Sequence, residues 1–397
     1  MSKITANILL QCTAEEIYAD VKAGYLSPQI LFRDAREVIR PKFDSHDDVL
    51  EKFLSDSFSL LDNCVETKEI KKLIIEVSVL VNAGLYGKSV CLDNILKIDN
   101  FLRKEERCSS SCFSGGVISY VLGDYKTAEK KFMEFDCIKP EKILYHQTAA
   151  PAFRDRSYCP QPRSTDSAGE IKWCKKAEPK NITVLVSCDI GYFVAYGKNY
   201  IDTIKKYNSD LNVHFHIINP IEDIVSQADF LTQTWIGYST EKVDYGNVKT
   251  YSSLARYIIA PSVIERYGNS VFISDIDLLV EKNPHFLSSS CRNLIGLYIG
   301  RKKARYFPWT AIKAGAGFYP NEQKSIAFLK TVGDFMLDMY SAGNDGWMLD
   351  QVALEFSFRL HSNLEYLDLK NLDYPIGQVK NRGGMRRIAS DVIRNGL

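Results

Sequence analysis

From residue 181 onward, apolar runs of strand length alternate with longer segments that have helical spacing. Runs rich in Val and Ile predict strands at 184–187, 213–218 and 271–273, since β-branched residues favour extended backbone and turn-forming or polar residues bound each run. Segments 194–207 and 252–267 have the apolar spacing of helices. This alternation predicts an α/β sheet, in which ligands gather at the carboxyl ends of the strands.

Two aspartates follow the third predicted strand directly. Asp275 and Asp277 lie in the run Val-Phe-Ile-Ser-Asp-Ile-Asp-Leu-Leu-Val at 271–280. Carboxylates at the end of a buried strand are costly unless a cation or a row of hydrogen-bond donors offsets their charge. Mg²⁺ and Mn²⁺ prefer carboxylate oxygens together with substrate phosphates, so the pair is a candidate metal–diphosphate site. The structural alternative is one capping Asp and one solvated turn residue.

The first 150 residues have a different pattern, with apolar residues at helical spacing throughout. The segment from Gly123 to Pro140 is similar to the second helix of a tetratricopeptide repeat, with Ala128 at the helix crossing and Phe132 in the core. We predict a helical, tetratricopeptide-like domain over 1–150, for which a generic helical bundle is the alternative. The Pro-containing segment 151–180 is predicted to be a linker before the α/β domain at 181–397.

Composition limits the classes of function. The 397 residues suffice for two domains, and a net charge of +1 argues against a large nucleic-acid footprint. No apolar run approaches about 18 residues, so no transmembrane helix is predicted. The N-terminal residues make a poor secretory signal, and ten cysteines are scattered without framework spacing, so we expect a cytoplasmic protein with reduced thiols.

Residues 181 to about 355 resemble the GT-A fold of nucleotide-sugar-dependent glycosyltransferases. Five features occur in the family's order: a strand ending in Ser187-Cys-Asp-Ile-Gly-Tyr-Phe193, a helix carrying Arg256, the Asp-x-Asp strand, the small-residue strand Lys313-Ala-Gly-Ala-Gly-Phe-Tyr-Pro320, and the Asp-Gln helix Trp347-Met-Leu-Asp-Gln-Val-Ala-Leu354. The resemblance implies a Rossmann-like GT-A sheet. It also implies Mn²⁺- or Mg²⁺-dependent transfer of a sugar from a nucleotide-diphosphate donor, with UDP-sugar favoured, to an acceptor hydroxyl on a glycan or protein.

The resemblance also suggests a binding role for each of these features. Ser187, Asp189 and Tyr192 correspond to the loop that holds the base and ribose of the nucleotide. Gly315 and Gly317 shape the sugar pocket, because residues without a Cβ allow close approach of the backbone. Each of these positions has an ordinary structural alternative, such as a core tyrosine or a strand-terminating aspartate.

Two further residues are predicted to take part in catalysis. Arg256 could reach a phosphate or Asp275 as a bidentate donor, and Asp350 is the acidic group expected to contact donor sugar or acceptor. Asp277 is the expected direct metal ligand, and Asp275 is expected to contact ribose, donor sugar or the metal through water. His285 and His361 are candidate additional ligands, and the basic run 301–305 is a candidate loop over the diphosphate.

Two other classes of protein remain open. A haloacid-dehalogenase-type phosphatase also places Asp-x-Asp after a strand, although here Leu278 and Leu279 follow where that family has Thr or Val, and about 90 α/β residues come first. The chain could instead be a non-catalytic helical-repeat adaptor with an inactive transferase-like domain. The helical region suits either binding of an acceptor or association of two copies into a homo-oligomer, and the sequence leaves both open.

Overall fold

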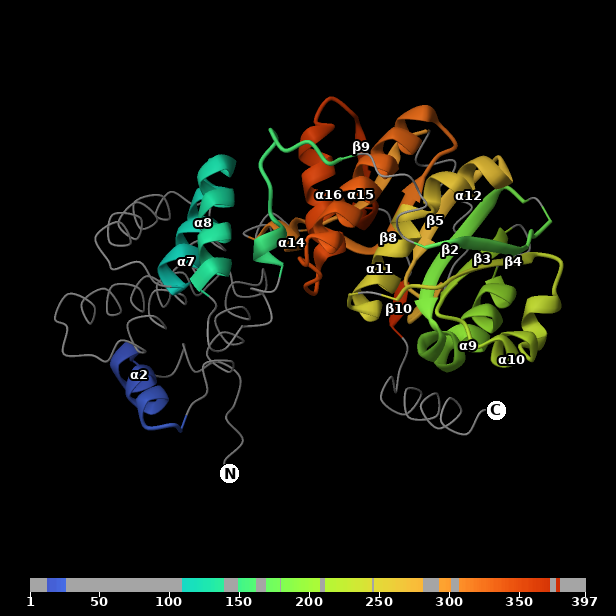
Figure 1. Ribbon diagram of the computed structural model, residues 1–397, viewed down its shortest axis with the longest axis horizontal. Coiled ribbons are helices and arrows are strands. Elements are labelled where there is room, and N and C mark those ends of the chain that lie inside the picture. The colour runs from blue at the N-terminus through green and yellow to red at the C-terminus, as the bar shows by residue number, and fades with distance from the viewer. Residues whose placement is uncertain are drawn as a thin grey trace. The chain divides into compact units, whose positions relative to one another are not determined.

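The computed structural model describes residues 13–25, 109–138, 149–161, 169–178, 180–207, 211–244, 246–280, 293–300, 307–371 and 376–378. The chain forms two compact units, one made of Met1–Ser157 with Gly300–Ala311 and the other of Tyr158–Ile299 with Ile312–Leu397. The second unit contains the sheet, shown on the right of Figure 1. The predicted boundaries at residues 150 and 180 remain predictions.

The described part of the first unit is helical. It contains α2 (Ala14–Lys22), α7 (Ser109–Val121), α8 (Tyr125–Ile138), the 3-10 turn η2 (Ala150–Ala152) and α14 (Pro308–Ala311). Thr13 and Glu16 form the reciprocal hydrogen bonds of a capping box at the start of α2. Ala128 and Phe132 of α8 are buried, and the Phe132 ring contacts Phe153 and Trp309. Within the described helices a repeat of the tetratricopeptide type is not shown.

The second unit is built on an eight-stranded mixed sheet with strand order β1-β4-β3-β2-β5-β8-β7-β9. Its strands are β1 (Ile171–Lys175), β2 (Ile182–Asp189), β3 (Leu211–Ile218), β4 (Ile236–Glu241), β5 (Ser270–Ser274), β7 (Ile295–Ile299), β8 (Ile312–Tyr319) and β9 (Tyr366–Asp368). β6 (Leu278–Val280) and β10 (Ile376–Gln378) form a separate antiparallel pair. β4, β3, β2 and β5 run parallel, whereas β1 and β8 are antiparallel to their neighbours.

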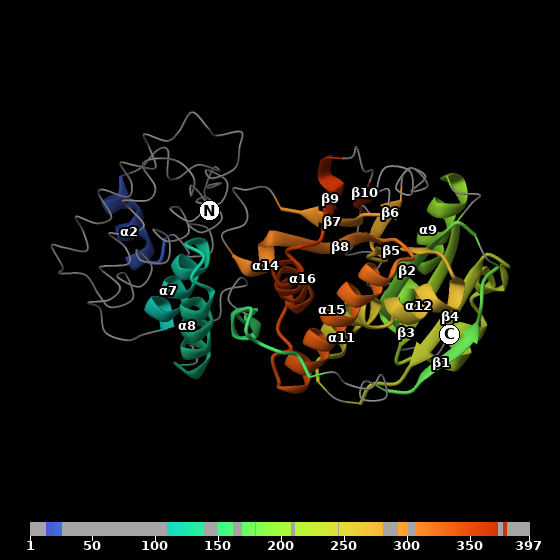
Figure 2. The same ribbon diagram turned by 90° about the horizontal axis from the view of Figure 1, so that it is seen from above.

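Helices cover both faces of this sheet (Figures 1 and 2). α9 (Ile190–Tyr207) covers one face, and α11 (Val248–Ile258), α12 (Ala260–Tyr267), α15 (Gln323–Ser341) and α16 (Leu349–Leu360) lie on the other. The remaining short helices are α10 (Glu222–Ser226), η4 (Asp229–Thr232) and η6 (Leu369–Asn371). Because both faces are covered, β3 is buried along its whole length, as expected of a strand in a parallel sheet.

The order of the parallel strands reverses between β2 and β5. The chain proceeds from β2 to β3 and β4 on one side and then returns to place β5 on the other side of β2. In an open α/β sheet, such a reversal leaves a crevice at the carboxyl ends of the two strands, where ligands bind. Asp189 ends β2, and Asp275 follows β5 directly, so both lie at this edge.

The predicted α/β class is confirmed, with one error in the helices. The predicted helix 252–267 is two helices, because Pro261 lies in the first turn of α12, where its missing N–H breaks the continuous hydrogen-bond ladder. α12 then ends at Gly268, whose φ of 67° is left-handed. In the described part of the chain, no helix is long and apolar enough to cross a bilayer.

Candidate functional site

The two aspartates of the Asp-x-Asp run lie in the turn that joins β5 to β6. The strand before them is buried, whereas the side chain of Asp275 is 33% exposed and Asp277 is half-buried. The backbone N–H of Asp275 donates to the Gly315 carbonyl at 3.1 Å. The turn is therefore attached to β8, and the carboxylate of Asp275 is held where solvent or a ligand can reach it.

An irregularity in the pairing of β8 with β7 leaves a backbone carbonyl of β8 next to the site. The register of the β7–β8 pair shifts between Leu297, which faces Gly317, and Tyr298, which faces Lys313. The residues between them have no partner in β7, so the Ala314 carbonyl is free for other donors. It accepts from Arg256 Nη2 at 3.2 Å and from the Tyr257 hydroxyl at 2.7 Å. Bulges of this kind commonly re-aim groups beside active sites.

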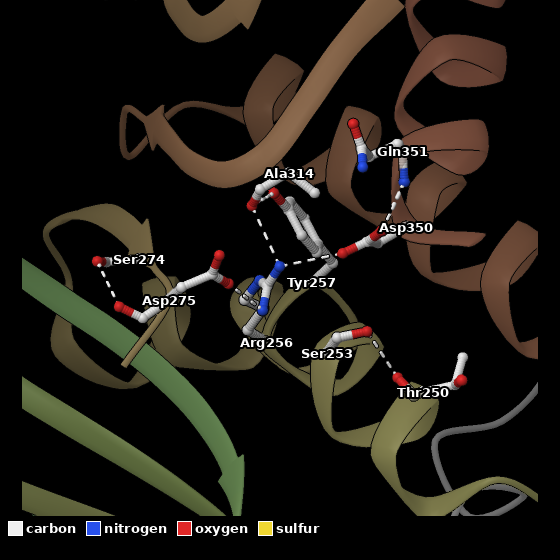
Figure 3. Close-up of polar contacts among 9 residues, drawn as sticks. All are labelled: Thr250, Ser253, Arg256, Tyr257, Ser274, Asp275, Ala314, Asp350 and Gln351. Carbon is white, nitrogen blue, oxygen red and sulfur yellow. Dashed lines mark hydrogen bonds and ion pairs between the residues drawn. The ribbon is translucent and has the colours of Figure 1, made fainter. Parts of the chain in front are cut away.

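Arg256 of α11 connects the carboxylates of the site (Figure 3). Its Nη1 is 2.7 Å from Asp275 Oδ1, and its Nη2 is 3.1 Å from Asp350 Oδ2. The side chain is 5% exposed. Burial by itself lowers the pKa of the guanidinium, but the neighbouring Asp275 raises it, so the net shift is upward and Arg256 is always a cation. The guanidinium thus fixes two acids from different elements at one place.

Asp350 lies in the first turn of α16 and points toward Arg256 in Figure 3. Burial raises the pKa of this carboxyl to about 6, although Arg256 opposes the shift. Its Oδ1 accepts from the Gln351 backbone N–H at 2.8 Å. A carboxylate with a pKa near neutrality can exchange a proton at physiological pH, which is what a general base or acid requires.

The two predicted glycines of β8 have different surroundings. A Cβ on Gly315 would lie 2.9 Å from Asp275 Oδ2, so only glycine leaves the carboxylate its position. A Cβ on Gly317 would instead lie 2.8 Å from the Tyr319 ring. Gly315 is therefore part of the acid cluster, whereas the contact found for Gly317 is one of packing, and a ligand role for either stays a prediction.

The predicted nucleotide-binding residues lie at the end of β2. Asp189 accepts from the Tyr192 backbone N–H at 2.8 Å and so caps α9. Tyr192 is half-buried, with its ring centroid 5.4 Å from that of Tyr196. Ser187 is buried, and its hydroxyl has no hydrogen-bond partner among the described residues. The structure brings these three to the same sheet edge as Asp275, and their binding roles remain predictions.

The described side chains fit a metal ion that is bound partly by the protein and partly by the phosphates of a substrate, rather than an ion enclosed by protein ligands alone. Across the described ranges, no group of three or more His, Cys, Asp or Glu side chains could enclose an ion. Mg²⁺, however, is usually held by one or two carboxylates plus substrate phosphates. Asp275 and Asp277 are candidates for hard oxygen ligands of this kind, and their role as metal ligands stays a prediction.

Two of the other sequence candidates lie outside the described residues, namely His285 and the basic run 301–305. His361 follows the last residue of α16, whereas Asp350 is in the first turn of that helix. The Nε2 atom of His361 is 3.0 Å from the hydroxyl of Thr331 in α15. That position argues against a role for His361 beside the Asp-x-Asp turn.

The sequence did not predict the part played by Tyr257 and Ala314. Tyr257 is buried next to Arg256 in α11, and its hydroxyl donates to the Ala314 carbonyl. The side chain appears in the sequence only as one more apolar residue of a helix. Its role depends on the β8 irregularity, for which the only local sign is the cluster of small residues at 314–317.

No protein-family model and no curated protein sequence matches the chain. Similar solved structures include the glycosyltransferase GlyE of Streptococcus pneumoniae TIGR4, with 16% identity and a TM-score of 0.35 over 55% of this chain and 52% of that one. The bifunctional glycosyltransferase WbbM, in its apo form, has 14% identity and a TM-score of 0.36 over 55% of this chain and 46% of that one. The galactosyltransferase LgtC, in complex with donor and acceptor sugar analogs, has 14% identity and a TM-score of 0.29 over 43% of this chain and 70% of its own. The chain thus spans about half the length of the first two, and all three of these similar structures are glycosyltransferases.

Proposed function

We propose that the chain is a metal-dependent glycosyltransferase that moves a sugar from a nucleotide-diphosphate donor, UDP-sugar above all, to an acceptor hydroxyl on a glycan or protein. The observation that carries the proposal is the acid cluster at the reversal of strand order. Asp275 and Asp277 lie at the carboxyl edge next to β2, where open α/β sheets bind nucleotides. Arg256 joins that cluster to Asp350.

The proposed cation is Mn²⁺ or Mg²⁺, held by Asp277 with Asp275 beside it. When bound, it would supply positive charge that stabilises the diphosphate as a leaving group. Arg256 already compensates part of the negative charge of the two acids, because its guanidinium is within 2.7 Å of Asp275 Oδ1. The side chain of Asp275 is 33% exposed, so a ligand could reach it.

The remaining residues would position the substrates. Ser187, Asp189 and Tyr192 would bind the nucleotide at the end of β2, and Gly315 would let the sugar approach the backbone of β8. Asp350 would accept the proton of the acceptor hydroxyl, since a pKa of about 6 leaves it mostly ionised at neutral pH yet basic enough to take a proton.

The first unit is proposed to bind the acceptor or a second copy of the chain through its helices. Helical units with exposed faces suit extended partners. This part of the proposal is independent of the acid cluster, and measuring the oligomeric state in solution with and without acceptor would separate its two alternatives.

Incubation of the purified chain with Mn²⁺ and a panel of UDP- and GDP-sugars tests the function. We expect transfer of the sugar from one donor, or slow hydrolysis of that donor, and loss of this activity in Asp277→Ala. Asp202→Ala is the control, because Asp202 is an exposed aspartate of α9 whose partner is Lys198. Full activity in Asp277→Ala would refute the metal assignment.

A phosphoenzyme trap and a calorimetric binding measurement separate the alternative classes. A phosphatase of the haloacid-dehalogenase type would need Asp275 as its nucleophile, and would be trapped as a phosphoenzyme on that residue. A non-catalytic adaptor would bind no nucleotide-sugar with Mn²⁺.

A further inference from the structure

The backbone carbonyl of Ala314 binds Arg256, although neither of the described neighbouring strands fixes its direction. β8 pairs with β7 up to Lys313 and again from Gly317 onward, and it pairs with β5 from Ala316 onward. Ala314 lies between these stretches and has no cross-strand partner in β5 or β7. In a regular sheet, cross-strand hydrogen bonds fix the direction of each carbonyl. At Ala314 that direction depends on other donors.

The residue that follows, Gly315, adds little restraint on this peptide. A Cβ at this position would lie 2.9 Å from Asp275 Oδ2, so the carboxylate requires a glycine here. Glycine also restricts φ and ψ least, so its sterics do not fix the Ala314–Gly315 peptide. A turned peptide would present the Gly315 N–H, which is a donor, to the Arg256 guanidinium, which only donates. The site therefore needs a group that holds the Ala314 carbonyl.

Tyr257 supplies that group (Figure 3). Its hydroxyl donates to the Ala314 carbonyl at 2.7 Å, whereas Arg256 Nη2 lies 3.2 Å from the same oxygen. The first distance is typical of an O–H···O bond, and the second is at the long end of the range for N–H···O. A carbonyl oxygen has two lone pairs and can accept from both donors. The closer of the two is the hydroxyl of Tyr257.

The ring of Tyr257 is itself fixed by packing. The residue is fully buried, and its ring is perpendicular to that of Tyr319, with the centroids 6.4 Å apart. Tyr319 in turn stacks on Phe328 of α15 with a centroid distance of 6.3 Å. Burial raises the pKa of the Tyr257 hydroxyl, against the opposing effect of Arg256, so the hydroxyl keeps its proton. Tyr257 is therefore a permanent donor whose position is fixed.

The Ala314 carbonyl matters to the site because of the way in which Arg256 distributes its hydrogen bonds. Nη2 is shared between the Ala314 carbonyl at 3.2 Å and Asp350 Oδ2 at 3.1 Å. Nη1 is 2.7 Å from Asp275 Oδ1. The guanidinium is a rigid planar fork, so a movement of one nitrogen also moves the other. Loss of the carbonyl would leave Nη2 with Asp350 and would let the fork rotate relative to Asp275.

We propose that Tyr257 is a positioning residue, which holds the Ala314 carbonyl so that the Arg256 guanidinium keeps its orientation. The guanidinium in turn keeps the Asp275 carboxylate where the diphosphate of the donor is proposed to bind. Tyr257 thus acts through Arg256 rather than by contact with a substrate. The effect on donor binding rests on the proposed function, whereas the effect on the guanidinium does not.

Tyr251 offers a matched control on the same helix. Tyr251 and Tyr257 are both fully buried in α11, and each hydroxyl donates a hydrogen bond of 2.7 Å. The acceptor of Tyr251 is Glu241 Oε1 of β4, which lies outside the proposed site. Because that acceptor is an acidic side chain, Tyr251→Phe should destabilise the protein at least as much as Tyr257→Phe does. A general loosening of α11 would therefore appear in both variants.

Rotation of the Arg256 guanidinium gives the first test. Carbon-13 and nitrogen-15 NMR spectra of the full chain with labelled arginine, assigned by comparison with Arg256→Lys, measure the rate of rotation about the Nε–Cζ bond. Tyr257→Phe should raise this rate about threefold to tenfold over the wild type, since the restraint of about one hydrogen bond is lost. Tyr251→Phe should leave the rate unchanged. Equal rates in the wild type and Tyr257→Phe, or an equal increase in both variants, would overturn the inference.

Calorimetric titration of UDP in the presence of Mn²⁺ gives the second test, with the wild type and both variants. Tyr257→Phe should weaken the binding of UDP about tenfold, as expected when a charged group loses its optimal hydrogen bonding. Tyr251→Phe should bind UDP like the wild type. Wild-type affinity in Tyr257→Phe would contradict the positioning role. Absence of UDP binding in the wild type would instead refute the proposed function, and the rotation rates would still decide the role of Tyr257.

Discussion

Two buried polar clusters contact α11, and they differ in how many of their polar atoms have a hydrogen-bond partner in the protein. In the buried row that runs from Tyr267 through His214, Ser239, His216 and Glu241 to Tyr251, each side chain has a hydrogen-bond partner. The other cluster consists of Arg256, Asp275 and Asp350 and is called here the Arg256 cluster. In it, Arg256 Nε has no hydrogen-bond partner within the described residues, and the side chain of Asp275 is 33% exposed. Burial also raises the pKa of Asp350 to about 6. We expect a cluster that is complete without a ligand to be structural, whereas the open cluster with a raised carboxyl pKa is the candidate for ligand binding.

The largest expected loss of stability comes from a substitution that breaks the Arg256 cluster. Arg256→Ala removes the cation beside the buried Asp350, and loss of one partner from a buried pair costs about 3–5 kcal/mol. Lys198→Ala is the control, because Lys198 pairs with Asp202 at 2.8 Å on the exposed surface of α9, where such pairs contribute less than about 1 kcal/mol. Chemical denaturation of the wild type, Arg256→Ala and Lys198→Ala measures the loss of unfolding free energy in each variant. Similar losses in the two variants would contradict the role given to Arg256.

The next prediction concerns the pH dependence of the unfolding free energy, to which the two clusters contribute with opposite signs. The folded pKa of Asp350 lies above its ordinary value of 3.8, so the folded state binds this proton first and gains stability as the pH falls through about 6. His214 has the opposite sign, because its lowered pKa removes stability as the pH falls below 6.5.

Replacement of Asp350 isolates its share of that response. A shift of about two pKa units corresponds to about 3 kcal/mol. The difference in unfolding free energy, Asp350→Asn minus wild type, should therefore decrease by about 1–3 kcal/mol between pH 7 and pH 4. A difference that is constant over this range would show that Asp350 is not held at a raised pKa.

The smallest expected effect concerns the glycine beside Asp275. In Gly315→Ala the new Cβ would lie 2.9 Å from Asp275 Oδ2, so the carboxylate must shift at a cost of about 1–3 kcal/mol. In Gly115→Ala the new Cβ meets Lys131 at an ordinary 3.5 Å, and the helix α7 should gain about 0.5–1 kcal/mol. Thermal unfolding distinguishes the two signs. A stabilised Gly315→Ala would remove Gly315 from the site.

Local pattern was enough to predict the elements that bear the site. Val271–Ile273 lies within β5, and the small-residue run 313–320 largely coincides with β8, because β-branched and small residues bounded by turn formers indicate strands. Arg256 was predicted on a helix near the aspartates, and the structure pairs it with Asp275. These features depend on residues close together in the sequence.

Long-range features could not be obtained in the same way. The alternation of His214 and His216 in β3 indicates that they share a face, but their partners come from β4, α11 and α12. The register shift in β8, which frees the Ala314 carbonyl for Arg256, depends on pairing with β7. Such contacts are decided by the packing of distant segments rather than by local preference.

Calorimetric titration of UDP into the full chain, with and without Mn²⁺, tests the central claim most directly. The account predicts that the wild type and Asp202→Ala bind UDP in the presence of Mn²⁺, and that Asp277→Ala loses this binding while remaining folded. Mn²⁺-dependent binding that persists unchanged in Asp277→Ala, or no binding of UDP or GDP by the wild type, would contradict the assignment of this edge of the sheet as a metal–diphosphate site.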